Sequence, residues 1–328
     1  MGLRARWGRG RGTRANDPSF LPRERLGREA RLARNLERVY DVGQDRIWNG
    51  GDVLQTLLDK HGPVDIPEPA CSAVRELLGA MLWGELAAWK VSAELAHLLP
   101  SHEGRLAATS QAHDEARHFR VIHDYLELIG GPTDAPAPSA MQTLDKVLAA
   151  DTLAKKLVGM QLLVEPVALT LFTILRRSEV CPVLTELLPY LEQDEARHVN
   201  VGTNLLPELV RDMGWAEAAD YWAYQGRLFH LEVRGLAEME PALRTLGFDP
   251  REVYRLGQGK QVGAARMVTD QLGGSAERIT DWMRAGMEFT AVYRFPGPEE
   301  RRDVLSRLRA GLAAARQTEA PAAHLLVR

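Results

Sequence analysis

Apolar residues recur three and four positions apart over most of the chain, which is the period of an amphipathic helix. No stretch of alternating apolar and polar residues is long enough to indicate a strand. In the middle of the chain the pattern predicts four long helices, at about residues 72–99, 102–129, 153–177 and 183–211. The breaks between them coincide with residues that usually end helices, namely Pro100, Gly130-Gly131-Pro132, Pro182 and Gly214. The sequence therefore predicts an all-α fold.

The two ends of the chain extend this helical pattern. A helix is expected from about Pro22 to Tyr40, and residues 61–69, which include three prolines, are expected to be extended. Further helices are expected at about residues 215–238, 250–271, 276–293 and 299–316. We divide the chain into an arginine-rich N-terminal extension (1–40), a lead-in segment (41–71), a four-helix bundle (72–212) and additional helices that pack on the bundle (213–328).

Composition and charge narrow the class of protein. The 328 residues are 45% hydrophobic and 26% charged, as in a globular protein with a large core. The net charge of -3 gives no electrostatic reason to expect nucleic acid as a partner. Cys71 and Cys181 are isolated, and no apolar segment follows the N-terminal arginines. We therefore expect a cytoplasmic protein rather than a secreted one.

Two stretches could suggest other partners. Residues 157–175 are apolar enough to span a membrane, but Glu165 near their middle favours a buried bundle helix, so no membrane partner is expected. Residues 1–38 contain eleven arginines and no lysine. We interpret this stretch as a solvated extension; the alternative is a contact with an acidic partner or nucleic acid.

The candidate chemistry lies in a phrase that occurs twice. Asp-Glu-Ala-Arg-His stands at residues 114–118 and again at 194–198. In each copy a Glu and a His lie three positions apart and face the same way on a helix. A lone glutamate in apolar surroundings, Glu85 or Glu165, lies thirty residues before the Glu of each copy, and a shift of eighty residues superposes the two sets. Four Glu and two His in this order form the ligand set of a di-metal centre in a four-helix bundle.

The predicted helix ends support this interpretation independently. Pro100 lies midway between Glu85 and Glu115, and the break at residue 180 lies midway between Glu165 and Glu195. Fifteen residues up and fifteen down place both carboxylates of each hairpin at one level, about 22 Å from the turn. Two hairpins with their acidic residues at matching heights can close around one site.

We assign three ligands to each metal and expect the Glu of each Glu-x-x-His pair to bridge the two ions. The two sets are Glu85, Glu115 and His118, and Glu165, Glu195 and His198. Carboxylate oxygen with imidazole nitrogen suits iron or manganese.

The neighbours of these ligands have expected roles of their own. Asp114 and Asp194 are placed to accept hydrogen bonds from the ligand histidines, and Arg117 and Arg197 are placed to pair with those aspartates. Pro166 has no N–H to donate to the carbonyl of residue 162, so the helix is expected to bend or bulge beside Glu165. Gln111 and Gln161 each precede a ligand Glu by one turn.

The alternative is a pair of solvated helix faces, on which such a phrase forms ion pairs between neighbouring turns. Glu85 and Glu165 argue against it, because a carboxylate in an apolar helix is costly unless it is paired or bound to metal.

At these residues the sequence resembles the ferritin-like di-iron carboxylate superfamily, over about residues 72–212, and most closely its oxygen-activating oxidases and oxygenases. The resemblance implies a ferritin-like four-helix bundle whose six ligands bind two Fe ions, or a Mn/Fe pair, with O2 as co-substrate. Ile122 stands where ribonucleotide reductase small subunits have a radical tyrosine. Leu191 stands where aminoarene N-oxygenases have a seventh ligand, a histidine. No single member family is therefore identified.

The expected function is that of an O2-dependent non-haem di-iron oxidase or oxygenase acting on a small or medium organic substrate by hydroxylation, N-oxygenation, desaturation or a related oxidation. An external electron donor, such as a reductase or ferredoxin, and a homodimer are the expected partners. The alternatives are a ferroxidase, iron-handling or peroxide-scavenging protein, a non-catalytic subunit of an oxygenase complex, and a hydroxylase of modified tRNA. Chain length counts against iron storage, and the complete set of six ligands counts against a non-catalytic subunit.

Overall fold

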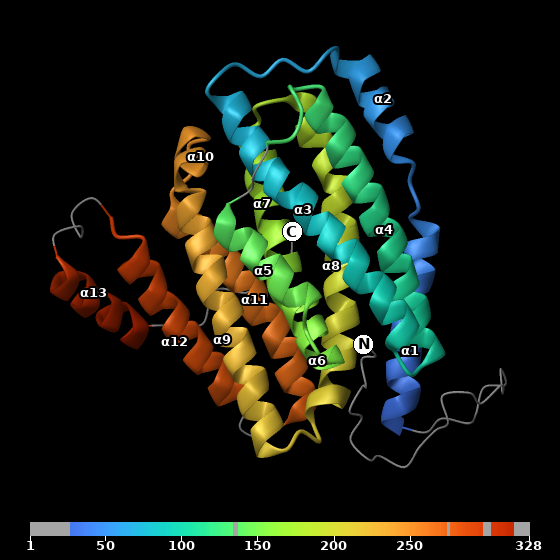
Figure 1. The fold of residues 1–328 in the computed structure, drawn as a ribbon, viewed down its shortest axis with the longest axis vertical. Coiled ribbons are helices and arrows are strands. Elements are labelled where there is room, and N and C mark those ends of the chain that lie inside the picture. The colour runs from blue at the N-terminus through green and yellow to red at the C-terminus, as the bar shows by residue number, and fades with distance from the viewer. Residues whose placement is uncertain (1–26, 134–136, 274–275, 298–302, 318–328) are drawn as a thin grey trace.

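Four antiparallel helical rods form the centre of the computed structural model, which describes residues 27–133, 137–273, 276–297 and 303–317 (Figure 1). The first hairpin pairs α3 (Ala70–Leu98) with α4 (His102–Glu127). The second pairs a continuous rod, made of α6 (Leu153–Leu157), η1 (Val158–Val164) and α7 (Glu165–Ser178), with α8 (Pro182–Val210). No strand occurs in the described part of the chain. The predicted all-α four-helix bundle with additional C-terminal helices is confirmed.

The helices of the two hairpins begin and end where serine, glycine and proline predict it. The side chain of Ser101 caps α4 by accepting a hydrogen bond from the N–H of Gly104 at 3.1 Å. Gly130 and Gly131 follow α4 with φ values of 99° and 81°, a left-handed conformation that favours glycine. Pro182 occupies the first turn of α8, where its missing N–H costs nothing. Local sequence thus fixes the level at which each hairpin folds back.

The third rod contains the distortion that Pro166 predicts. Residues Val158–Val164 form a π-helix, and the N–H of Glu165 donates to the carbonyl of Met160, five residues earlier. Close packing against α8 accompanies the distortion, because a side-chain carbon on Gly202 would lie only 2.6 Å from Cβ of Gln161. The whole rod, Leu153–Ser178, is long and apolar enough to span a membrane, but 78% of its most apolar window is buried inside the protein. It is a core helix.

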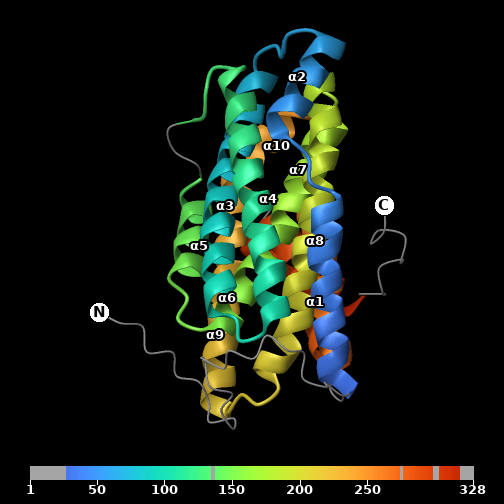
Figure 2. The ribbon, with the colours of Figure 1, turned by 90° about the vertical axis from the view of Figure 1, so that its right-hand side faces the viewer.

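Two N-terminal helices cover the side of the bundle formed by α4 and α8. They are α1 (Gly27–Asp45) and α2 (Gly50–His61), and both pack against α4 and α8 (Figure 2). Leu36 of α1 is fully buried, and a side chain on Gly43 would collide with Ser110 of α4. The sequence predicted a helix in the region of α1 but not α2. Residues 1–26 lie outside the described residues, so the interpretation of their arginines stays a prediction.

The remaining helices lie on the opposite side. They are α5 (Pro138–Leu148), α9 (Trp215–Glu238), α10 (Glu240–Thr245), α11 (Pro250–Leu272), α12 (Ala276–Arg294) and α13 (Val304–Arg316). Helix α5 packs on α3 and α9, and α11 packs on α7 and α8. The pair α12 and α13 lies at the outer edge of the molecule (Figure 1). The four predicted C-terminal helices correspond to α9, α11, α12 and α13.

The apolar core of the bundle is divided into two clusters along the bundle axis, and a third, smaller cluster lies among the C-terminal helices. One contains Leu77, Ile122, Phe172 and Leu188, and the other contains Leu95, Ala107, Leu157 and Leu205. On each of the four rods the predicted metal ligands fall between a residue of the first cluster and a residue of the second. A polar layer is therefore closed above and below by apolar side chains.

Candidate metal centre

The six predicted ligands meet in this polar layer, and none is more than 3% exposed. Their ligand atoms form two groups, within each of which all atoms lie no more than 4.8 Å apart. The two groups are Glu85, Glu115, His118 and Glu195, and Glu115, Glu165, Glu195 and His198. Glu115 and Glu195, the glutamates of the two Glu-x-x-His pairs, belong to both groups. These are the two residues for which the sequence predicts a bridging position.

Both histidines turn Nδ1 toward the carboxylates. Nδ1 of His118 lies 3.3 Å from Oε2 of Glu85 and 3.1 Å from Oε1 of Glu195. Nδ1 of His198 lies 2.9 Å from Oε1 of Glu115 and 3.5 Å from Oε2 of Glu195. Each ring thus presents one nitrogen to the middle of the site.

The other nitrogen of each histidine contacts an aspartate of the opposite hairpin. Nε2 of His118 lies 3.1 Å from Oδ2 of Asp194, and Nε2 of His198 lies 3.2 Å from Oδ2 of Asp114. The pairing is crossed, because each aspartate comes from the phrase that does not contain its histidine. These two contacts link α4 to α8 on the side of the histidines that faces away from the glutamates.

Two arginines bridge the two aspartates. Nη2 of Arg117 donates to Oδ1 of Asp114 at 2.6 Å and to Oδ2 of Asp194 at 2.8 Å. Nη2 of Arg197 donates to Oδ1 of Asp194 at 2.9 Å and also to Oδ2 of Asp114. The structure therefore places both arginines between both aspartates, and the four residues form one closed network.

Trp48 completes this network from outside the bundle. Its Nε1 donates to Oδ2 of Asp194 at 2.9 Å. The guanidinium of Arg117 lies 4.8 Å from the centre of its ring, at cation–π distance. Trp48 precedes α2 and carries no local signal of this role, so sequence reasoning missed it.

Electrostatics in the layer follow from burial opposed by close partners. Burial raises the pKa of Glu85 well above its usual value, and the charge of Glu195 adds to this effect. Burial also acts on Glu115, but the two histidines outweigh it and lower the pKa of Glu115. Burial lowers the pKa of His118, whereas its hydrogen bonds to Asp194 and to three glutamates raise it well above the usual value.

Several buried polar atoms of the layer have no hydrogen-bond partner. Two of them are acceptors of predicted ligands, Oε2 of Glu115 and Oε2 of Glu195, and others are Oε1 of Gln161, Nε of Arg117 and Nη1 of Arg197. Unpaired buried acceptors are costly in a folded protein, and a cation held among them removes that cost. The residues present therefore fit a pair of cations bound by oxygen and imidazole nitrogen.

Gln111 binds two of the carboxylates from one side of the layer, and Gln161 binds Gln111. Nε2 of Gln111 donates to Oε1 of Glu165 at 2.9 Å and to Oε1 of Glu115 at 3.1 Å. Nε2 of Gln161, from the π-helix, donates to Oε1 of Gln111 at 3.3 Å. This chain of amides fixes the orientation of Glu165 relative to Glu115.

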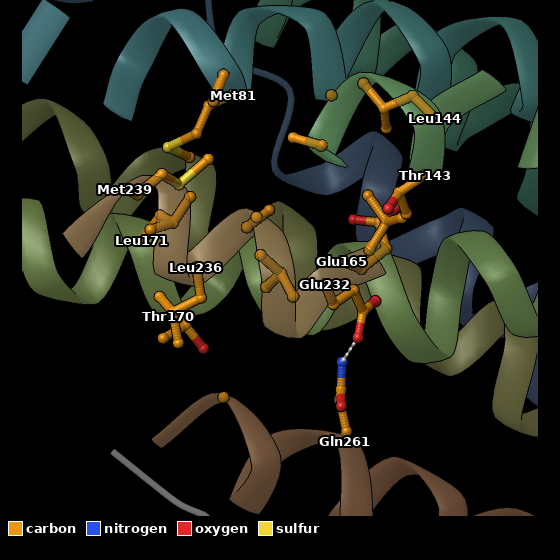
Figure 3. A pocket seen from close by; sticks show the side chains of 18 of the residues that line it. Met81, Thr143, Leu144, Glu165, Thr170, Leu171, Glu232, Leu236, Met239 and Gln261 are labelled. Atoms are coloured by element: carbon orange, nitrogen blue, oxygen red, sulfur yellow. Dashed lines mark hydrogen bonds between the residues drawn. The ribbon is translucent and has the colours of Figure 1, made fainter. Parts of the chain in front are cut away.

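A cavity of about 140 Å³ borders the carboxylates on the side away from the histidines. Glu85, Glu165 and Glu195 contribute to its wall. The remaining wall is mostly apolar and comes from α3, α5, α7, α9 and α11. Figure 3 shows Met81, Met239 and Leu171 gathered at one end and Glu165, Glu232 and Thr143 at the other. The C-terminal helices, which the sequence assigned to packing, thus close a cavity beside the site.

Comparison with known proteins agrees with this architecture. Residues 70–156 match a family described as a ferritin-like domain of actinomycetes. No curated protein matches the chain in sequence. Two variants of an R2-like ligand-binding oxidase with a Mn/Fe cofactor superpose on it with TM-scores of 0.58 and 0.57, at 16% and 15% sequence identity. Each alignment covers 71% of this chain and 93% of the other.

The protein has a ferritin-like fold. The family match covers α3, α4, α5 and the start of the third rod, so it includes Glu85, Glu115 and His118 and ends before Glu165. Within the ferritin-like bundle, sequence reasoning found the six converging residues and the aspartates and arginines beside them. It missed Trp48 and Glu232, which belong to helices or turns outside the bundle.

Proposed function

We propose that the six buried ligands bind two metal ions, either two Fe or one Mn and one Fe, and that the protein uses them to oxidise a small or medium organic molecule with O2. The observation that carries this proposal is that Glu115 and Glu195 belong to both groups of ligand atoms. Two overlapping groups that share two carboxylates suit a pair of ions better than one. The Mn/Fe cofactor of the R2-like oxidases with the same fold supports the choice of metals.

The aspartates prepare the histidines for this role. Asp194 accepts a hydrogen bond from Nε2 of His118, and Asp114 accepts one from Nε2 of His198, so the proton of each neutral ring is held on Nε2. The raised pKa of His118 keeps a second proton on its Nδ1 when no metal is bound, and a bound cation would replace this proton and take the Nδ1 lone pair. Burial raises the pKa of Asp194, but His118 and Arg197 outweigh it and lower that pKa, so Asp194 stays an acceptor at neutral pH.

The charges of the layer favour divalent cations. Four glutamates and two aspartates face two arginines, which leaves four negative charges. Two divalent ions balance these charges, and a buried layer closed by apolar side chains favours neutrality.

The neighbouring cavity is the proposed substrate site. A bound metal pair of this type would supply the electrons that reduce O2. An external electron donor would re-reduce the metals, and a reductase or ferredoxin is the expected donor. The chain itself contributes an apolar wall that excludes water and places the substrate beside Glu85, Glu165 and Glu195. A ferroxidase needs no such cavity, so this feature favours oxidation of an organic molecule over iron handling. The free cysteines Cys71 and Cys181 are compatible with the reducing cytoplasm as the site of action.

The test is metal content followed by reaction with O2. Protein expressed with iron is expected to contain about two metal ions per chain. After anaerobic reduction, mixing with O2 in a stopped-flow spectrometer is expected to give a transient visible absorption band. Glu115→Ala removes a ligand shared by both groups and is expected to lose metal and the absorption change while its circular dichroism spectrum stays helical.

Glu186→Ala is the matched control, because Glu186 lies on α8 but pairs with Lys60 at the surface. It is expected to keep both metals. Two metals with slow and featureless oxidation would favour iron handling instead. Protein without metal would mean that the six residues form only an ion-pair network, and the proposal would fail.

A further inference from the structure

Glu232 is the acidic side chain in the wall of the cavity that does not belong to the predicted metal ligands. It projects from α9, outside the bundle, and lies near Glu165 at the same end of the cavity in Figure 3. Its Oε2 accepts a hydrogen bond from Nε2 of Gln261 at 3.0 Å. Its Oε1 is buried and has no hydrogen-bond partner. Oε1 of Glu232 is therefore a fixed acceptor atom in the cavity wall that the protein does not satisfy.

Gln261 holds Glu232 in a defined orientation. The same Nε2 also donates to the carbonyl of Leu163, inside the π-helix, at 3.2 Å. Oε1 of Gln261 accepts from Nε2 of Gln258 at 3.4 Å. These hydrogen bonds fix which atom of the Gln261 amide is the nitrogen and which is the oxygen. The amide also connects Glu232 to the rod that carries Glu165. A carboxylate fixed in this way is preorganised for a ligand.

Apart from the predicted metal ligands, the rest of the wall has few polar groups. The hydroxyl of Tyr254 and Oε1 of Gln258 are also without a hydrogen-bond partner, but neither belongs to a carboxyl group. The hydroxyl of Thr170 donates to the carbonyl of Pro166 at 2.7 Å, and that of Thr143 donates to the carbonyl of Ser139 at 3.0 Å. Both hydroxyls are therefore already occupied. The wall at the far end from Glu232 is formed by Met81, Leu171 and Met239 (Figure 3). A molecule that fills the cavity is mostly apolar and, apart from the predicted metal ligands, meets a carboxyl group at Glu232.

We propose that Glu232 binds a hydrogen-bond donor, an amine or a hydroxyl group, on an otherwise apolar substrate, and that it excludes substrates with a carboxylate at this position. This inference rests on the proposed function, whose substrate class it names. A donor satisfies the unpaired Oε1, whereas a carboxylate places a like charge against it. Burial raises the pKa of Glu232 to about 7 despite the hydrogen bond from Gln261. Near neutral pH Glu232 is therefore partly ionised: its charged form accepts from an ammonium ion or a hydroxyl group, and the carbonyl oxygen of its neutral form accepts from a hydroxyl group.

The experiment compares three probes that share one apolar chain and differ in the head group: octylamine, 1-octanol and octanoate. Their affinities are measured by isothermal titration calorimetry on metal-free and on iron-loaded protein, both without O2. The amine and the alcohol are expected to bind at least about tenfold more tightly than octanoate. Octanoate binding as tightly as either of them, or no binding of any probe, would overturn the proposal.

Variants assign the preference to Glu232. Glu232→Gln keeps the shape and an acceptor oxygen but removes the charge, so octylamine is expected to lose about tenfold in affinity while 1-octanol changes less than about threefold. Gln261→Met releases the carboxyl group from its partner and is expected to weaken octylamine binding by an intermediate factor. Thr170→Val is the control, because its hydroxyl is already satisfied within α7, and the ratio of amine to octanoate affinity is expected to stay unchanged. An unchanged ratio in Glu232→Gln would contradict the assignment.

The proposal for Glu232 and the proposal of a metal centre can each fail without the other. Probe binding to metal-free protein does not depend on metal or on O2. A protein that binds two metals and reacts with O2 but prefers octanoate would retain the proposed function and refute the role of Glu232. A protein that prefers octylamine but holds no metal would do the reverse.

Discussion

On the histidine side of the candidate metal centre, Asp114 and Asp194 each accept hydrogen bonds from a histidine and two arginines, and Trp48 adds another to Asp194. On the opposite side, Glu85, Glu165 and Glu195 border an apolar cavity, and nearby acceptor atoms are unpaired. One side is filled by the protein's own polar groups. The other leaves room for a ligand.

The helices reflect this difference. The histidine side lies between α4 and α8, which are regular helices at the level of the ligands and are covered by α1 and α2. The cavity side includes the π-helix before Glu165, a distortion that occurs frequently at functional sites. Two copies of one sequence phrase, with the lone glutamate before each copy, are thus enough to specify the ligands. The π-helix and the added helices on one side determine where a substrate has access.

The largest expected effect comes from breaking the histidine side. Asp194→Ala leaves Arg117 and Arg197 buried with one carboxylate fewer, so the free energy of unfolding is expected to fall by about 3 to 5 kcal/mol. Urea denaturation of the metal-free protein measures this. Asp124→Ala, which removes an exposed partner of Arg120 on α4, is the control and is expected to cost less than about 1 kcal/mol. Equal losses in both variants would show that the buried network contributes no more to stability than a surface ion pair does.

A change on the cavity side is expected to have a smaller effect. Gly202→Ala places a carbon against Cβ of Gln161, which cannot move without shifting the π-helix, so a loss of about 1 to 3 kcal/mol in unfolding free energy is expected. Gly226→Ala on α9 is the matched control, since no atom lies within 4 Å of the added carbon. It is expected to stabilise the helix by roughly 0.5 to 1 kcal/mol. A stabilising Gly202→Ala would contradict the close approach of α8 and the π-helix.

The pH dependence of stability sharpens the comparison further. The pKa of Glu232 rises from 4.5 to about 7 on folding because of burial. The folded state therefore holds a proton that the unfolded state releases between these values, and stability falls as pH rises through this window. Glu232→Gln removes this contribution, so its stability relative to the wild type is expected to increase by roughly 2 to 3 kcal/mol between pH 5 and pH 8. Denaturation curves at several pH values measure the difference, and parallel curves would refute it.

The smallest effect is expected from the outer end of the histidine side. Trp48→Phe removes one of several hydrogen bonds to Asp194 but keeps an aromatic ring beside Tyr190, whose ring centre lies 5.2 Å from that of Trp48. A loss of roughly 0.5 to 1 kcal/mol is expected in urea denaturation. A loss as large as that of Asp194→Ala would mean that Trp48, rather than the arginines, holds the aspartate.

The sequence was sufficient to predict the bundle and the six converging residues. Helix ends could be placed because Pro100, Gly130 and Pro182 act locally, and the ligands could be placed because a shift of eighty residues relates them. Pro166 predicted a distortion for the same local reason, since a missing N–H is visible in the sequence. These features depend on neighbours along the chain.

The remaining features depend on how distant helices pack. The crossed contacts between His118 and Asp194 and between His198 and Asp114 follow from the rotation of α4 against α8, which no local pattern encodes. Glu232 reaches the cavity only because α9 packs over α5, and an isolated glutamate on a helix gives no signal of burial. Such roles become visible only in three dimensions.

The most direct test of the central claim is a crystal structure of the iron-loaded protein with anomalous diffraction data collected at the iron edge. Two anomalous peaks are expected in the polar layer. One is expected among Glu85, Glu115, His118 and Glu195, and the other among Glu115, Glu165, Glu195 and His198. A single peak, or iron bound only outside this layer, would contradict the account.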